Sequence, residues 1–93
     1  MAESKIALVT GAAGVLGKAT AKGLLEEGMK VVLADLDQEQ LNRLSEELEG
    51  ETYPIAFDVS DPLQVREAGK KIDQEFGEVD ILVAGIGTGG TIT

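Results

Sequence analysis

The chain contains no cysteine, no histidine and no tryptophan, and it has only one tyrosine and two phenylalanines. Without cysteine there is no disulfide framework, thiolate chemistry or zinc–thiolate site, and without histidine the commonest general base and metal ligand is missing. So few aromatic side chains argue against a surface that stacks nucleic-acid bases. No apolar run approaches the length of a membrane span, and residues 1–4 lack a signal-peptide pattern, so we expect a cytoplasmic protein.

Positive charge is also scarce. Eight lysines and arginines face 17 aspartates and glutamates, which gives a net charge of −9. An acidic surface is attracted neither to a phosphate backbone nor to anionic headgroups, so we expect no nucleic-acid and no membrane partner. The chain has 93 residues, of which 43% are hydrophobic. This length allows one small core, and we predict a single domain over 1–93 in which 84–93 form a glycine-rich tail.

Short apolar runs alternate with segments of helical spacing. The apolar runs predict strands over residues 5–10, 30–34, 52–57 and 80–84. Three helices are predicted between them, beginning at Val15 and after the N-caps Asp37 and Asp61, and ending at Gly28, Gly50 and Gly77. In the first helix the spacing assigns Leu16, Ala19 and Gly23 or Leu24 to the inward face.

This alternation predicts an α/β fold, because continuous apolar strands separated by amphipathic helices form a parallel sheet that is covered on both faces. Right-handed crossovers favour a half-Rossmann three-layer sandwich of four parallel strands in order 3-2-1-4, with three crossover helices. The first two helices are expected on one face and the third on the other. Pro54 suits an edge strand, because proline cannot donate to the ladder. The fourth strand is expected to be buried.

A glycine-rich turn over residues 10–17 joins the first strand to the first helix. Gly11, Gly14 and Gly17 allow the backbone to approach a pyrophosphate, and the helix start offers free N–H groups. The alternative is that these glycines serve only a tight turn. A triphosphate-binding Walker loop is excluded because alanines occupy positions 12 and 19, where that motif needs a glycine and a serine or threonine.

Two acidic residues follow the second and third strands. Asp35 stands about 20 residues beyond the loop, where a carboxylate accepts hydrogen bonds from an adenosine ribose and repels a 2′-phosphate, so NAD is favoured over NADP. The alternative for Asp35 is a solvated acid at a strand end. Asp58 is a candidate acceptor for the adenine amino group, and its alternative role is to cap the turn that leads to Asp61.

Residues 5–83 resemble the N-terminal half of a short-chain dehydrogenase/reductase, on the strength of the glycine turn, Asp35, the pair 58–59 and the segment 76–83. The resemblance implies a pyrophosphate turn, an adenosine-ribose contact, an adenine contact and a fourth-strand contact. By this resemblance the pyrophosphate turn comprises Gly11, Gly14, Val15, Leu16 and Gly17. Asp35 and Leu36 are implied at the ribose, and Asp58 and Val59 at the adenine. The fourth-strand contact is implied at Ala84 and Gly85. The chain departs from the family at Val15, where a glycine is usual, and before Ala84, where two asparagines are missing.

The tail resembles a second family. Residues 83–93 are similar to the phosphate loop of cysteine synthase and other fold-type II pyridoxal-phosphate enzymes. The resemblance implies that the phosphate of pyridoxal phosphate is held by Gly87, Thr88, Gly89, Gly90 and Thr91. This suggests an engineered chimera or fragment, and the alternative is an unrelated flexible glycine tail.

The chain is not expected to be an enzyme by itself. The family it resembles uses a serine and a Tyr-x-x-x-Lys helix, whereas Tyr53 is followed by Pro54 and has Phe57 four places on. We therefore predict a module that binds the adenosine and pyrophosphate half of NAD. The alternatives are a minimal engineered or chimeric α/β protein without a selected ligand, and an oxidoreductase fragment that needs its catalytic half. A homodimer is expected, through the exposed fourth strand or the uncovered sheet face.

Overall fold

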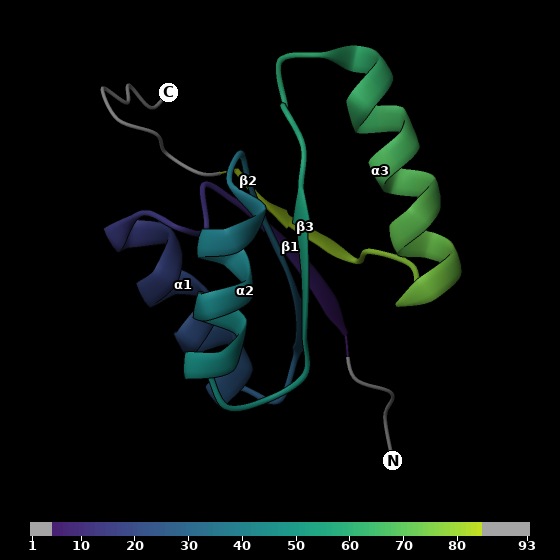
Figure 1. The fold of residues 1–93 in the computed structure, drawn as a ribbon. Helices are drawn as coiled ribbons and strands as arrows, with labels where there is room; N and C mark the ends of the chain where they lie inside the picture. The colour runs from purple at the N-terminus through teal and green to yellow at the C-terminus, as the bar shows by residue number, and fades with distance from the viewer. Residues whose placement is uncertain (1–4, 85–93) are drawn as a thin grey trace.

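The computed structural model describes residues 5–84. Its elements are β1 (Ile6–Thr10), α1 (Val15–Glu26), β2 (Lys30–Asp35), α2 (Gln38–Glu47), β3 (Thr52–Ala56), α3 (Pro62–Glu75) and β4 (Ile81–Val83). The four strands form one parallel sheet in the order β3-β2-β1-β4, which confirms the predicted fold class and topology (Figure 1). Pro54 lies in β3, at one edge of this sheet.

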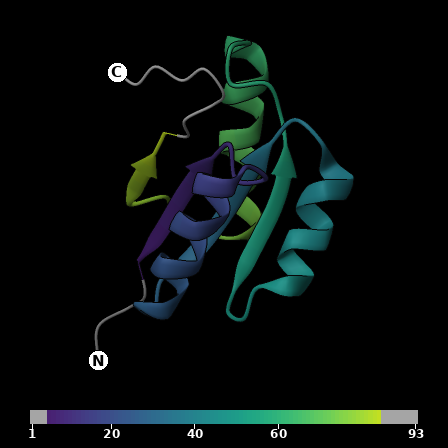
Figure 2. The ribbon, with the colours of Figure 1, turned by 90° about the vertical axis from the view of Figure 1, so that its left-hand side faces the viewer.

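The sheet is the middle of three layers. Helices α1 and α2 cover one face and α3 lies on the other, as predicted (Figures 1 and 2). Because successive residues of a strand point to opposite faces, β2 contributes to two separate cores. Val31 and Leu33 pack in the core beneath α1 and α2, with Leu41 and Leu44 of α2. Val32 and Ala34 pack in the core beneath α3, with Ile72.

The N-caps of α2 and α3 were predicted correctly. The Asp37 side chain accepts hydrogen bonds from the N–H groups of Glu39 and Gln40. The Asp61 side chain accepts in the same way from Leu63 and Gln64. Both helices therefore begin with a side chain that satisfies the free N–H groups of the first turn.

The predicted inward face of α1 was correct only at Leu24, one of the two alternatives for its third position. Leu16, Ala19 and Gly23 are all exposed, and the buried residue of this helix is Ala21. Gly17 packs so closely on the turn before the helix that it fixes the rotation of α1. The inward positions then follow Gly17 at helical spacing, which selects Ala21 and the partly buried pair at 24–25.

The fourth strand was predicted at an edge of the sheet, which is confirmed, but its predicted burial over 80–84 was wrong. The strand covers only Ile81–Val83, and Leu82 is 64% exposed. Leu82 is exposed because β4 is an edge strand of the described sheet and α3 does not cover this side chain. Two hydrogen bonds join its approach to β1: Asp80 N donates to the Ile6 carbonyl (2.8 Å), and Ile6 N donates to Asp80 Oδ2 (2.9 Å).

Candidate functional site

The predicted site residues lie along one edge of the sheet. Gly11 follows β1, Asp35 ends β2, Asp58 comes shortly after β3, and Ala84 follows β4. All four strands are parallel, so their carboxyl ends meet at this edge. The chain also reverses its direction of winding there, because β2 and β4 lie on opposite sides of β1. In open α/β sheets this switch point is where ligands bind.

The turn between β1 and α1 is held tightly by its glycines. Gly11 has φ 68°, a left-handed conformation that favours glycine, and its carbonyl accepts from Gly14 N at 3.1 Å. A Cβ placed on Gly17 would lie 2.0 Å from the Gly11 carbonyl oxygen. Only glycine therefore fits at position 17 while the start of α1 rests on the turn.

Helix α1 begins without a side-chain cap. Gly14 is its N-cap residue and offers no side-chain acceptor, in contrast to the capping aspartates of α2 and α3. Within residues 5–84, the N–H groups of Val15, Leu16 and Gly17 have no hydrogen-bond partner; the first bond of the helix runs from Lys18 N to the Gly14 carbonyl. These three donors, together with the positive end of the helix dipole, suit an anion.

Asp35 is turned toward this loop. Its Oδ2 accepts from Ala13 N at 2.9 Å, and its Oδ1 accepts from Leu36 N at 2.7 Å. The residue is half-buried, whereas the Leu36 side chain beside it is exposed. The structure thus brings Asp35 and the glycine turn together, over 22 residues of sequence.

Asp58 makes the turn that was considered as its alternative role. Its Oδ1 accepts from both the N–H (2.9 Å) and the hydroxyl (2.7 Å) of Ser60, and its carbonyl accepts from Asp61 N. These hydrogen bonds from Ser60, that of the hydroxyl above all, lower the pKa of the Asp58 carboxyl. Oδ2 accepts no hydrogen bond within the described residues, so the carboxylate keeps one free oxygen.

Not every predicted site residue can be placed. Val59 and Ala84 are exposed at the carboxyl edge. Gly85 lies outside the described residues, and so do all five tail positions assigned to a phosphate loop: Gly87, Thr88, Gly89, Gly90 and Thr91.

Lys18, whose position raised the question of a Walker loop, is directed to α2. Its Nζ lies 2.8 Å from Glu47 Oε1, and this hydrogen-bonded ion pair lowers the pKa of Glu47. The single tyrosine, Tyr53, donates its hydroxyl to Glu75 and stacks on Phe76. No cluster of three or more acidic residues within 5–84 could hold a metal ion.

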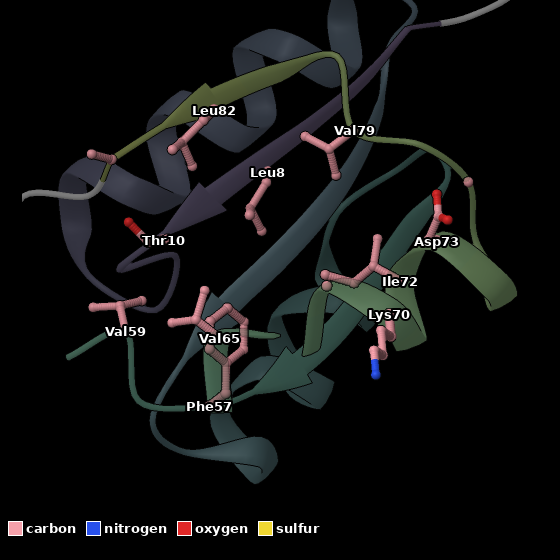
Figure 3. A pocket seen from close by; sticks show the side chains of 13 residues that line it. Leu8, Thr10, Phe57, Val59, Val65, Lys70, Ile72, Asp73, Val79 and Leu82 are labelled. Carbon is pink, nitrogen blue, oxygen red and sulfur yellow. The ribbon is translucent and has the colours of Figure 1, made fainter. Parts of the chain in front are cut away.

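An apolar hollow of about 690 Å³ lies between α3 and the strands β1 and β4, on the sheet face that was expected to be incompletely covered. Figure 3 shows the side chains of Leu8, Leu82 and Val65 turned toward it, and Thr10 and Val59 lie at one end. Val65 of α3 is 41% exposed there. In the sequence this hollow is marked only by the short apolar run 81–83, and such a run is equally typical of a strand that a helix covers.

A family model described as short chain dehydrogenase matches residues 5–93. The chain belongs to this family. The match continues through residues 84–93, so the comparisons assign the tail to the same family and do not support a chimera or a pyridoxal-phosphate loop. Within the described residues no helix is both long and apolar enough to cross a membrane.

Relatives of known name are oxidoreductases. The 3-oxoacyl-(acyl-carrier-protein) reductase FabG of Thermotoga maritima is 38% identical over 88 residues, which cover 91% of this chain and 36% of the relative. The solved 3-ketoacyl-(acyl-carrier-protein) reductase of Brucella melitensis, complexed with NADH, is 39% identical with a TM-score of 0.81, covering 91% of this chain and 36% of that one. The L-sorbose reductase of Gluconobacter frateurii, complexed with NADPH and L-sorbose, is 32% identical with a TM-score of 0.82, covering 98% and 36%.

The chain thus spans about a third of the length of the relatives it matches. Solved relatives carry either NADH or NADPH. Family membership therefore relates the chain to oxidoreductases, among which solved relatives bind NADH or NADPH.

Proposed function

We propose that this chain is the nucleotide-binding part of a short-chain oxidoreductase and binds the adenosine and pyrophosphate half of NAD. The observation that carries the proposal is the uncapped start of α1 beside Asp35. The other two helices of the described chain are capped by aspartates, which would exclude an anion. Among residues 5–84, free N–H donors and an acidic residue for a ribose occur together only at the glycine turn.

The pyrophosphate is assigned to the turn over residues 11–17. The N–H groups of Val15, Leu16 and Gly17 supply donors, and the absence of side chains at Gly11 and Gly14 lets phosphate oxygens approach the backbone. The side chains of Val15 and Leu16 are 87% and 64% exposed, so they do not contribute to the core of the described chain. We assign them to the walls of this subsite.

Asp35 is assigned to the adenosine ribose, with Leu36 beside it. Each carboxylate oxygen has two lone pairs and accepts one backbone N–H, so each retains a lone pair for a ribose hydroxyl. A 2′-phosphate would place negative charge against this carboxylate, which favours NAD over NADP. Asp58, through its free Oδ2, and Val59 are assigned to the adenine, and Ala84 and Gly85 to the far end of the cofactor.

Catalysis is assigned to the part of the relatives that this chain does not span. A bound nicotinamide dinucleotide supplies hydride transfer. Tyr53 donates its hydroxyl to Glu75, and Phe57 occupies the position where the family's lysine would stand. In this proposal the described residues bind and orient the cofactor, and the acid or base that acts on a substrate is assigned to the remainder of the protein.

The test is a titration of the 15N-labelled chain with NAD and with NADP, followed by amide chemical shifts. We expect saturable shifts over residues 11–17 and at Asp35, with an NAD dissociation constant weaker than about 10 μM, because half a site lacks the nicotinamide contacts. Asp35→Ala should weaken the affinity for NAD roughly tenfold or more, since it removes hydrogen bonds to a charged acceptor. It should also narrow the ratio of the affinity for NAD to that for NADP.

Glu46→Ala is the matched control. It removes the same charge from an exposed position on α2 for which the structure gives no hydrogen bond or ion pair. It should change the affinities for NAD and NADP equally and little. If millimolar NAD shifts none of the loop amides, the proposed function is wrong; if Asp35→Ala weakens both dinucleotides equally, Asp35 does not discriminate between them.

A further inference from the structure

The carboxylate of Asp35 is hydrogen-bonded to the glycine turn over residues 11–17, called the phosphate turn below. Its Oδ2 accepts the Ala13 N–H at 2.9 Å, while the neighbouring Ala12 N–H donates to the Ala34 carbonyl at 3.0 Å. One main-chain bond and one side-chain bond, on adjacent residues, therefore join the turn to the end of β2.

These bonds engage the middle of the turn. The turn's own hydrogen bonds run from Gly14 N to the Gly11 carbonyl and from Lys18 N to the Gly14 carbonyl. Neither uses the N–H of the peptide between Ala12 and Ala13, and Gly14 has no side chain with which to cap the helix. The bond from Ala13 to a carboxylate is charge-assisted and stronger than a neutral one. It sets the orientation of the peptide that leads into the free N–H groups of α1.

We propose that Asp35 is a positioning residue for the phosphate turn, in addition to its assigned contact with the ribose. The consequence of this inference for cofactor binding rests on the proposed function. One carboxylate then serves both halves of the nucleotide: its hydrogen bond to Ala13 orders the pyrophosphate donors, and its remaining lone pairs face the ribose. A change at Asp35 made to admit NADP would disturb the pyrophosphate subsite for both cofactors.

The positioning role and the charge of Asp35 predict opposite effects on a ligand that has no ribose. Inorganic pyrophosphate is repelled by a nearby carboxylate, so loss of the charge alone would strengthen its binding. Loss of the hydrogen bond to Ala13 would release the turn and weaken the same binding. The sign of the change therefore separates a residue that orders the turn from one that only meets the ribose.

The decisive measurement is hydrogen–deuterium exchange of the Ala13 amide in the ligand-free 93-residue chain. Asp35→Ala should raise the Ala13 exchange rate by about tenfold or more, since it removes the acceptor of a charge-assisted bond. Asp35→Asn retains one carbonyl acceptor and should raise it less. Glu46→Ala, which removes the same charge elsewhere, should not change it. Core amides such as Val9 and Leu33 report whether each variant remains folded.

Binding of inorganic pyrophosphate, at fixed ionic strength, is the second measurement. Asp35→Ala should weaken the shifts over residues 14–17 severalfold despite the lost negative charge, and Asp35→Asn should recover part of the affinity. Unchanged Ala13 exchange in a folded Asp35→Ala chain, or tighter pyrophosphate binding by it, would overturn the positioning role. A wild-type chain that fails to bind NAD would refute the proposed function, while Ala13 exchange would still decide the positioning role.

Discussion

Replacement of Gly17 by alanine should damage the fold and the site together. The added Cβ would lie 2.0 Å from the Gly11 carbonyl oxygen and 2.8 Å from the Ala12 Cα, both backbone atoms that cannot rotate away. The helix would have to move by about 1 Å to bring even the first contact to 3.0 Å. Overpacking typically costs about 1–3 kcal/mol, and a backbone clash belongs at the upper end of that range.

A second glycine of the same helix provides the control. A Cβ on Gly23 would meet nothing within 4 Å, so Gly23→Ala should gain up to about 1 kcal/mol from helix propensity alone. Gly17→Ala gains the same amount and loses more, which leaves a net destabilisation of roughly 2 kcal/mol. For a chain of this size that corresponds to a fall in Tm of about 10 °C.

Circular dichroism during thermal and urea unfolding measures both variants against the original chain. Gly23→Ala should unfold at a higher temperature and Gly17→Ala at a lower one, and only Gly17→Ala should lose the NAD-dependent amide shifts. Equal stability of the two variants, or retention of NAD binding by Gly17→Ala, would show that α1 does not rest on the turn as described.

Two titrations test the contacts of single side chains. The hydrogen bond to Glu75 is the main cause that raises the pKa of Tyr53 to about 12, and ultraviolet titration of this single tyrosine should show a midpoint there. Glu75→Ala should lower the pKa of Tyr53 toward 10. Glu78→Ala, at an exposed position, is the control and should leave it unchanged. The contribution of Tyr53 to stability is present below pH 10 and should be lost as the pH rises through about 12. For Asp58, Ser60→Ala should raise the carboxyl pKa toward its ordinary value, as followed by 13C NMR, because it removes the hydroxyl donor and keeps the backbone N–H. An unchanged pKa would contradict the hydrogen bond from the Ser60 hydroxyl.

The sequence predicted the order of the strands and the starts of α2 and α3. Strand order followed from apolar runs and right-handed crossovers, and the two aspartate caps followed from residue type and position. The face of α1 did not follow, because periodicity counts Leu16 as a core residue and cannot register that Gly17 must touch Gly11. Tertiary contact overrode the hydrophobic pattern there.

The site divides in the same way. The glycine turn and Asp35 could be located from the sequence, because the motif is defined by residue types at fixed spacings along the chain. The hydrogen bond from Ala13 to Asp35 joins residues 22 positions apart, and no periodicity marks it. The hollow beside Leu82 was predicted only in part: that sheet face was expected to be incompletely covered, but an apolar run does not show whether α3 reaches Leu82.

Self-association through β4 is the remaining prediction. Within the described chain β4 pairs only with β1, so its other edge presents free N–H and C=O groups along an apolar strand. Two copies of β4 related by a twofold axis would pair as antiparallel strands and place Leu82 opposite its counterpart. The strand has only three residues, which limits the buried area well below a standard interface. We therefore expect a weak dimer, with a dissociation constant of about 100 μM.

Light scattering on a size-exclusion column, over a range of loaded concentrations, measures this directly. The mass should rise above 9.7 kDa as concentration increases. Leu82→Lys should return it to the monomer value, because a charge at the edge opposes strand pairing. Leu16→Lys is the matched control, since Leu16 is equally exposed at 64% but lies on α1, away from β4. Leu82 is preferred to Val83 for this test because Val83 packs against the core beneath α1 and α2. A mass of 9.7 kDa at every concentration would exclude the dimer, and an equal response of both variants would place the interface elsewhere.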